Sequence, residues 1–467
     1  MTILSSLVGS DYRPAPAAAL MALAESGVPV HLPGTDDYAA LTRTSNLVKA
    51  IAPAGVVAVR DAQDVSHALR LAATAGVRVA VQGTGHGATE SMQDAILVST
   101  AALDEVTVHA GERWARIGAG VRWQAVLEAC APHGLAGLAG SSPDVGVVGY
   151  LTGGGLGPVA RTHGLASDTV RAFDVVTGDG TIRRASATQN PDLFWGLRGG
   201  KGTLGIVTAV EIDLVEQPSL YAGALWFDAA DAPAVIRTWS VWSSLLPEAG
   251  TTSFAVLHLP DLPVFPEVVR GRTSISVRFA WTGDPVEGAE MVQALRSVAE
   301  PVLDTVRVMP YAELGDIHSD PIDPMPLHEQ HSLLSSFGPE TADRLIELVG
   351  PAAATTLAVV EVRQLGGKVR DDRGVPSAFA FRDAEFSVFS LGVLVPEIAQ
   401  RVVSDSAHLH SGLAPWATDG GLPNFTDTAG PVWAARVFPP EVARRLQTLS
   451  LVYDPDGVLL AARGLRS

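Results

Sequence analysis

A histidine set among glycines is the first feature of this sequence that could do chemistry. His86 lies in the run Val81-Gln82-Gly83-Thr84-Gly85-His86-Gly87-Ala88, directly after a short apolar segment that predicts a buried strand. Glycine allows positive φ and close backbone approach, so successive N–H groups can turn inward and bind an anion. The spacing fits neither a dinucleotide fingerprint nor a phosphate-binding P-loop. We therefore predict an anion loop from Gln82 to Ala88 that leaves the His86 ring unshielded.

A second glycine-rich segment, residues 140–157, suggests a backbone laid against a large flat ligand. The five glycines from Gly149 to Gly157, four of them within five residues, are too dense for a regular helix. Tight turns alone would explain either cluster, but two clusters in one half of the chain favour a ligand. The candidate contacts are Ser141, Ser142, Val145, Gly146, Gly149, Tyr150, Gly153, Gly154, Gly155 and Gly157, with a weaker third set at Gly205, Ile206 and Val207.

Alternating helix and strand patterns position these loops. Asp61 begins a helix with apolar residues at helical spacing and Gly76 ends it, while 77–82 and 95–100 read as buried strands. Beyond residue 216 glycine thins out, and 359–367 and 385–395 alternate like strands of a mixed sheet. We predict an α+β protein with one domain at 1–215 (core about 48–217), a second at 216–418, and a C-terminal segment, 419–467, that rejoins the first.

Composition excludes several classes of function. The chain has 467 residues, 46 of them Gly, and carries 33 basic against 50 acidic residues, a net charge of −17. This acidity disfavours nucleic acid and anionic membranes as partners. The single cysteine, Cys130, forms no intrachain disulfide, and its helical pattern predicts a small buried side chain. There is no predicted metal site, secretory leader or membrane span, so we expect a cytoplasmic protein.

The ordered run of motifs resembles the FAD-linked flavoproteins of the vanillyl-alcohol oxidase and p-cresol methylhydroxylase (PCMH) type, in the berberine-bridge-enzyme-like branch. The matching segments are VAVQGTGHGA, SSPDVGVVGYLTGGGLG, HGLASDTVRAFDVVTGDG, NPDLFWGLRGGKGTLGIVT, VEVRQLGG, LPNFTD and YDPDGVLL. The resemblance implies a two-subdomain PCMH-type FAD-binding domain and an α+β substrate domain with a mixed or antiparallel sheet.

The same resemblance assigns roles to the loops. Residues 82–88 would hold the FAD pyrophosphate, and His86 would be linked to the flavin 8α-methyl group. Residues 141–157 would cover the flavin ring, Ile206 and Val207 would offer backbone contacts to adenine or the ring edge, and Asn424 would bond the flavin edge.

The sequence also departs from the family pattern. Ser142 stands where many relatives carry a second flavin-linking cysteine, so a single histidyl link is expected. Gln82 replaces a usual arginine, and Val145 is compatible with reaction with oxygen. Where relatives have Tyr-x-Asn-Tyr-x-Asp, this chain has Leu422-Pro-Asn424-Phe425-Thr-Asp427, so both tyrosine positions are apolar and cannot accept a proton.

Another residue must then accept the proton of the substrate. Glu361 and Arg363 share one face of a predicted strand, Glu385 lies on the next, and an apolar roof would raise the pKa of either carboxyl group. Glu361 and Arg363 could instead form a structural ion pair. Tyr150 could act as acid or base, or simply pack, and we expect His163 to be structural.

Three functions remain open. The first is an FAD-dependent oxidase or dehydrogenase acting on CH–OH, CH–NH or CH–CH groups of an apolar secondary metabolite, with O2 or another electron acceptor and Leu422 and Phe425 lining the pocket. The second is a non-redox cyclase or isomerase in which FAD is structural. The third is a metabolite-binding protein with a vestigial flavin.

Overall fold

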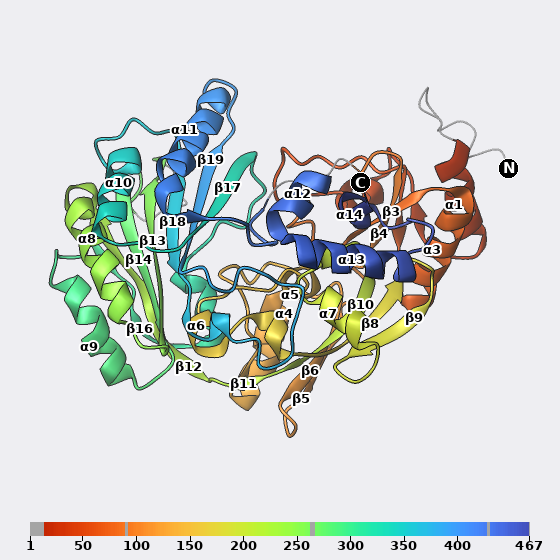
Figure 1. The fold of residues 1–467 in the computed structure, drawn as a ribbon, viewed down its shortest axis with the longest axis horizontal. Coiled ribbons are helices and arrows are strands. Elements are labelled where there is room, and N and C mark those ends of the chain that lie inside the picture. Colours follow the sequence, from red (N-terminus) through yellow and green to blue (C-terminus); the bar gives the residue numbers. More distant parts are fainter. Residues whose placement is uncertain (1–13, 89–91, 262–266, 427–429, 467) are drawn as a thin grey trace.

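The computed structural model describes residues 14–88, 92–261, 267–426 and 430–466. Within these ranges the chain begins and ends in the same half of the molecule, and residues 219–418 form the other half (Figure 1). Asp427, part of the C-terminal motif, lies outside the described residues, as does the N-terminal segment 1–13.

The N-terminal layer is a small sheet covered by helices. Its described strands have the order β1-β2-β4-β3, with β2, β3 and β4 parallel and β1 antiparallel. The elements are α1 (Pro14–Glu25), β1 (Val30–His31), α2 (Asp36–Leu41), β2 (Gly55–Ala58), α3 (Ala62–Ala75), β3 (Arg78–Gln82) and β4 (Ala95–Ser99).

Helix α3 has the caps that its sequence predicts. The Asp61 carboxylate accepts hydrogen bonds from the N–H groups of Gln63 and Asp64, at 2.8 and 2.9 Å, and Gly76 ends the helix with φ +64°. Its apolar face packs Val65 and Leu69 into the core beneath β3. A well-packed helix therefore fixes the strand that leads into the His86 loop.

An antiparallel sheet with the order β5-β6-β10-β8-β9 follows, flanked by short helices that hold the second glycine segment. Trp123 and Phe173 are fully buried in its core. Its elements are β5 (Val106–His109), β6 (Trp114–Gly118), α4 (Trp123–Cys130), β7 (Leu135–Ala136), α5 (Val147–Leu151), α6 (Ala160–His163), β8 (Val170–Thr177), β9 (Ile182–Ser186), α7 (Pro191–Leu197), β10 (Gly205–Asp213) and β11 (Val215–Glu216), with β7 and β11 paired separately.

The largest described sheet is antiparallel and has one face covered by helices. Its order is β15-β12-β14-β13-β18-β19-β17-β20, with β16 also paired to β12. The elements are β12 (Ser219–Asp228), α8 (Ala232–Trp242), β13 (Gly250–His258), β14 (Thr273–Trp281), α9 (Pro285–Arg296), β15 (Leu303–Asp304), β16 (Arg307–Pro310), β17 (Leu327–Leu334), α10 (Pro339–Val349), β18 (Val359–Gln364), β19 (Phe386–Val393), α11 (Ala399–Gly412) and β20 (Ala417–Thr418).

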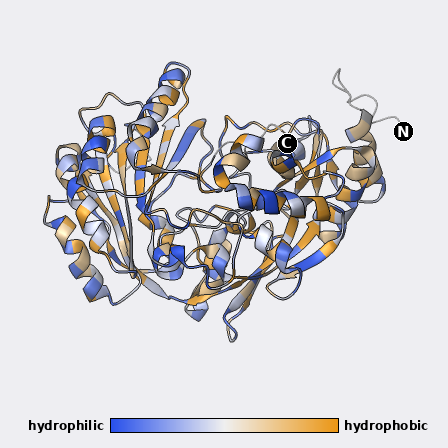
Figure 2. Cartoon of the chain, viewed as in Figure 1, coloured by the Kyte–Doolittle hydropathy of each residue, from blue (hydrophilic) through white to orange (hydrophobic). Residues whose placement is uncertain are grey.

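Strict alternation explains the two faces of this sheet. Phe254, Val277 and Val362 point to the outer face and pack with Trp239 of α8, on the side where α8, α9 and α10 lie (Figure 1). The residues between them face the rest of the protein and include serines and arginines. Hydrophilic stretches accordingly interrupt otherwise hydrophobic strands in Figure 2.

The C-terminal helices return to the first half of the molecule. They are α12 (Gly430–Val437), α13 (Pro440–Tyr453) and α14 (Arg463–Arg466). The segment between α13 and α14 runs beside β3, where the Val79 N–H donates to the Val458 carbonyl at 2.8 Å. Because the large sheet spans residues 219–418, we propose domain boundaries on either side of it, near 215 and 418. Among the described helices, none is both long and apolar enough to cross a membrane.

Candidate active site

Glycine and glutamine shape the loop after β3 by anchoring it to the segment before β2. Gly85 has φ +79°, and a Cβ there would lie 2.3 Å from the Arg43 carbonyl oxygen, so only glycine fits. The Gln82 amide donates to the carbonyls of Leu41 and Arg43 at 2.9 and 3.2 Å. Gln82, predicted as a cofactor contact, thus uses its amide N–H groups to position the loop.

The N–H groups of this loop are free to bind a ligand. In the described part of the chain, none of the backbone N–H groups from Gly83 to Ala88 donates to a protein acceptor. The His86 ring is exposed, and no protein atom described lies within 4 Å of a Cβ placed on Gly87. Consecutive unpaired N–H groups are what an anion-binding loop requires. These residues fit a diphosphate such as that of FAD.

The two glycine loops meet at Thr84. A Cβ on Gly146 would lie 2.9 Å from Thr84 Cγ2, so the segment 141–146, which includes Ser141, Ser142 and Val145, runs beside the His86 loop. Asp144 forms an ion pair with Arg122 at 2.7 Å. Desolvation by the surrounding protein lowers the pKa of His86, with Arg122 also lowering it and Asp144 opposing.

Glycines 153–157 are required mainly by contacts within the protein. Gly154 and Gly155 have φ +98° and +77°, and Cβ atoms there would lie 2.3 Å from Phe379 and 2.6 Å from Tyr150. At Gly157 a Cβ would lie 2.1 Å from the Ala139 carbonyl oxygen. By contrast, a Cβ on Gly149 has no described atom within 4 Å. Gly149 is therefore the glycine of this segment with room for close ligand approach.

Lys201 joins this site, although the sequence analysis did not single it out. It has φ +55°, unusual for a lysine, and its ammonium donates to the Gly149 carbonyl at 3.0 Å and to the Asn424 side-chain oxygen. Asn424 in turn donates to the Tyr150 carbonyl at 2.9 Å, and Gly153 lies against Asn424. Desolvation lowers the pKa of Lys201 to about 8. The sequence feature that could have pointed to Lys201 is its position in the glycine-rich run Arg-Gly-Gly-Lys-Gly.

The surroundings of the Tyr150 side chain indicate a packing role. Its ring meets Trp123 edge-on with 5.6 Å between centroids, and its buried hydroxyl has no hydrogen-bond partner in the described residues. Burial strongly raises the pKa of this hydroxyl. A phenol that holds its proton so firmly is a poor base, so the geometry favours the packing interpretation.

Glu361 lies in a buried cluster of cations. Its carboxylate accepts from Arg278 at 3.0 Å and from Arg363 at 3.1 Å, and His318 lies 3.4 Å away. Burial would raise the pKa of Glu361, but the charges of Arg363 and Arg278 outweigh burial and hold it well below its usual range. The expectation of a raised pKa for Glu361 was therefore wrong.

Glu385 does not lie in an apolar roof either. Its side chain is 40% exposed and pairs with Arg370. His163 is half-buried, and burial lowers its pKa. Cys130 is buried in the core, as its helical pattern predicted, and burial raises the pKa of its thiol to about 11.

Leu422 and Phe425 lie near the inner face of the large sheet. Leu422 is buried beside Leu156 and Phe379. Phe425 stacks on His331 with 5.7 Å between centroids, and the Arg363 guanidinium lies 5.5 Å from its ring centre. His331 was not predicted as a site residue.

The start of β10 leaves backbone groups available on one side. Strand β6 pairs with β10 only from Ala209 to Asp213, whereas β8 pairs with Gly205, Ile206 and Val207 from the other side. The side of 205–207 that faces away from β8 is thus free of strand pairing. This arrangement is compatible with the predicted backbone contacts to adenine.

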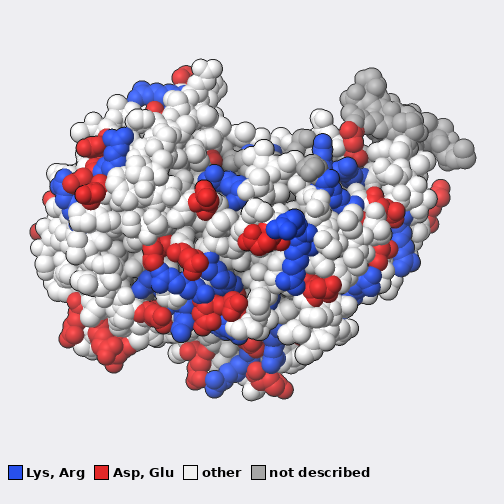
Figure 3. Space-filling model, in the orientation of Figure 1, with Lys and Arg blue, Asp and Glu red and all other residues white. Residues whose placement is uncertain are grey.

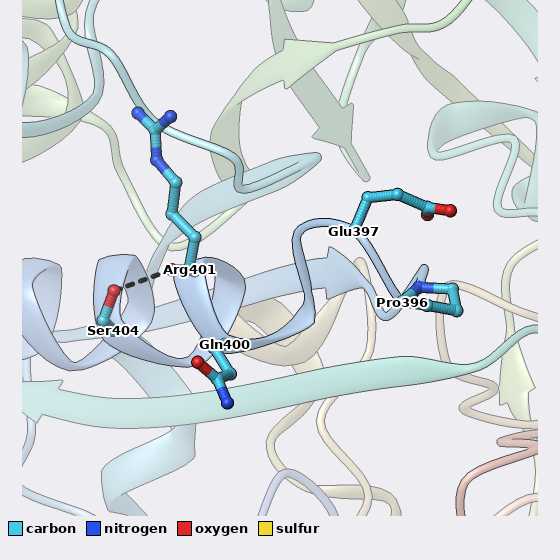
Figure 4. Close-up of a pocket in the computed structure, with 5 residues that line it drawn as sticks. All are labelled: Pro396, Glu397, Gln400, Arg401 and Ser404. Carbon is cyan, nitrogen blue, oxygen red and sulfur yellow. Dashed lines mark hydrogen bonds between the residues drawn. The ribbon is translucent and has the colours of Figure 1, made fainter.

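Outside these loops, the described surface has one open hollow and a mixture of charges. An open hollow of about 500 Å³ at the start of α11 is lined by Pro396, Glu397, Gln400, Arg401 and Ser404, none of them part of the loops above (Figure 4). Acidic and basic side chains are interspersed on the face shown in Figure 3. No group of three or more potential metal ligands occurs within the described residues.

The comparisons with known proteins agree with this geometry. Residues 53–186 match the family model of the FAD binding domain. The fold matches crystal structures of 6-hydroxy-D-nicotine oxidase from Arthrobacter nicotinovorans (TM-score 0.81, 22% identity, 92% of this chain and 96% of that one) and of BBE-like 1 from Physcomitrella patens (0.82, 18%, 96% and 99%). The chain shares its fold with a berberine-bridge-enzyme-like protein, and residues 53–186 match an FAD binding domain. The predicted α+β, PCMH-type fold is confirmed.

Curated relatives of this chain are named as FAD-linked or FAD-dependent enzymes and as an oxidase. An FAD-dependent monooxygenase of Fusarium proliferatum is 37% identical over 178 residues, covering 38% of this chain and 34% of that protein. (R)-6-hydroxynicotine oxidase of Paenarthrobacter nicotinovorans is 27% identical over 425 residues, covering 85% and 87%. The matches to the first three relatives span 34–44% of their lengths.

Proposed function

We propose that the protein is an FAD-dependent oxidase or dehydrogenase whose flavin is tethered once, through His86, and whose substrate is a mainly apolar small molecule of secondary metabolism. The observation that carries this proposal is the run of unpaired N–H groups from Gly83 to Ala88 around the exposed His86 ring, in contact with the second glycine loop.

Different groups of the protein would hold different parts of FAD. The N–H groups of 83–88 would bind the pyrophosphate without a lysine, and the His86 ring would form the link. Ser142 offers no thiol, so one link is expected. Lys201 and Asn424, joined to each other and to the loop at Gly149, would face the flavin edge. When bound, FAD supplies the acceptor for two electrons from a substrate C–H bond.

The substrate pocket would be formed by the apolar residues that replace the family's tyrosines. Leu422 and Phe425 cannot exchange protons, and Phe425 offers a flat apolar face beside His331. The relative named for 6-hydroxynicotine supports a cyclic amine as one candidate class. An apolar secondary alcohol is the other.

The test is anaerobic mixing of the purified flavoprotein with a panel of apolar cyclic amines and secondary alcohols. Bleaching of the flavin absorbance by a panel member, with peroxide formed when air is admitted, is the expected result and would identify O2 as the electron acceptor. Product formation with no bleaching at any substrate concentration would refute the oxidation.

A non-redox cyclase or isomerase is the second candidate, and the missing proton acceptors favour it. Leu422 and Phe425 are apolar, the Tyr150 hydroxyl is deeply buried and Glu361 is held in ion pairs. This alternative predicts turnover that persists without oxygen and leaves the flavin spectrum unchanged.

A further inference from the structure

The inner face of the large sheet carries a row of polar residues in direct register. Ser253 on β13 lies opposite Arg278 of β14 on one side and Arg363 of β18 on the other. Thr251 shares this face because side chains two apart on a strand point the same way. Arginines in central strands are rare unless paired. The arginines on this face of the sheet therefore need partners of opposite charge.

The cluster on this face has more positive than negative charge. Arg278 and Arg363, with side chains 7% and 9% exposed, share the single carboxylate of Glu361. Neither arginine pairs with another carboxylate within the described residues. The exposed Asp320 raises the pKa of nearby His318, whereas burial and Arg278 lower it. One buried positive charge is left without a counter-charge, which is costly unless an anion joins it.

Four polar atoms of the same cluster lack partners. They are Nε of Arg278, Nδ1 of His318 and the hydroxyl oxygens of Thr251 and Ser253, all buried. These four residues and Arg363 line one narrow cavity, which is also lined by Gly157 and Pro158 of the glycine-rich segment. Unpaired buried donors around an uncompensated cation are the chemistry of a carboxylate site.

We propose that this cavity binds a carboxylate of the substrate, so that the substrate joins an apolar body to an anionic group. This inference rests on the proposed function, because it uses the same pocket. Arg363 connects the cavity with the apolar site at Phe425, because it lines the cavity and its guanidinium lies over the Phe425 ring. A substrate with its apolar part on Phe425 would then place its carboxylate between Arg278, Thr251 and Ser253.

The test compares sodium benzoate with its neutral analogue benzamide by isothermal titration calorimetry on the flavin-loaded protein. We expect benzoate to bind about tenfold more tightly than benzamide, the order of a hydrogen-bonded charge. Thr251→Val and Ser253→Ala should each weaken benzoate binding several-fold and leave benzamide unchanged. Because these hydroxyls lack partners, neither variant should lower the melting temperature.

Thr252→Val is the matched control. Thr252 also borders the cavity, but its hydroxyl accepts from the Trp239 indole at 3.0 Å and donates to the Arg278 carbonyl at 2.7 Å. This variant should melt at a lower temperature and keep the benzoate preference. Equal binding of benzoate and benzamide, or loss of preference only in Thr252→Val, would overturn the inference. Calorimetry needs no turnover, so a benzoate preference in a protein whose flavin is never reduced would support this site while refuting the proposed function.

Discussion

Replacing Glu361 by glutamine should destabilise the protein strongly. The carboxylate is the shared partner of two buried guanidinium groups, at 3.0 and 3.1 Å. Glutamine has nearly the same shape but leaves Arg278 and Arg363 as uncompensated charges. Removing one partner of a buried ion pair costs about 3–5 kcal/mol. At about 2–4 °C per kcal/mol, the melting midpoint of Glu361→Gln should fall by roughly 6–20 °C.

Differential scanning calorimetry at neutral pH measures this shift, with Glu385→Gln as the control. Glu385 also pairs with an arginine, but its side chain is 40% exposed, and such surface pairs contribute about 0–1 kcal/mol. Because the folded-state pKa of Glu361 is depressed, its stabilisation is present above its unfolded pKa of about 4.3 and is lost as pH falls through the lower folded value. Equal midpoints for Glu361→Gln and Glu385→Gln, or a difference that grows on acidification, would refute the ion-pair cluster.

The remaining predictions concern the flavin loops. Gly85→Ala forces a positive φ onto alanine, about 1–2 kcal/mol of backbone strain, in addition to the contact with Arg43, so thermal stability and flavin retention should both fall. Gly87→Ala, made in a His86→Ala background, should leave the melting temperature of the flavin-free protein unchanged and weaken FAD binding in a fluorescence titration; unchanged FAD affinity would exclude close ligand approach at Gly87. Lys201→Met removes a cation from the predicted flavin edge and should lower the flavin reduction potential by about 30 mV or more, measured by dye equilibration; an unchanged potential would place Lys201 away from the flavin.

Local sequence signals predicted the elements that do not depend on distant partners. The Asp61 cap and the Gly76 end of α3 follow from chemistry within a few residues. The glycine spacing around His86 likewise predicted a loop with free N–H groups. Gly154 and Gly155 are instead required by packing against Phe379 and Tyr150. Sequence spacing alone does not distinguish glycines that free a loop for a ligand from glycines that are needed for packing.

The charge environment could not be predicted because its members come from separate strands and loops. The depressed pKa of Glu361 depends on Arg278, 83 residues away, and on His318, which lies outside the strand that carries Glu361. One local feature of the sequence could have indicated the charge cluster, because Arg278 is the only charged residue in the apolar strand β14. Lys201 acquires its environment only when Asn424 packs against Gly153.

The single flavin link at His86 is the central claim of this account. Intact-protein mass spectrometry after acid denaturation tests it directly, on the wild-type protein and on His86→Ala. The account predicts a mass increase of one FAD in the wild-type protein, located by peptide mapping on His86, and none in His86→Ala. Unmodified wild-type protein with all flavin in the acid supernatant, or FAD still attached in His86→Ala, would contradict it.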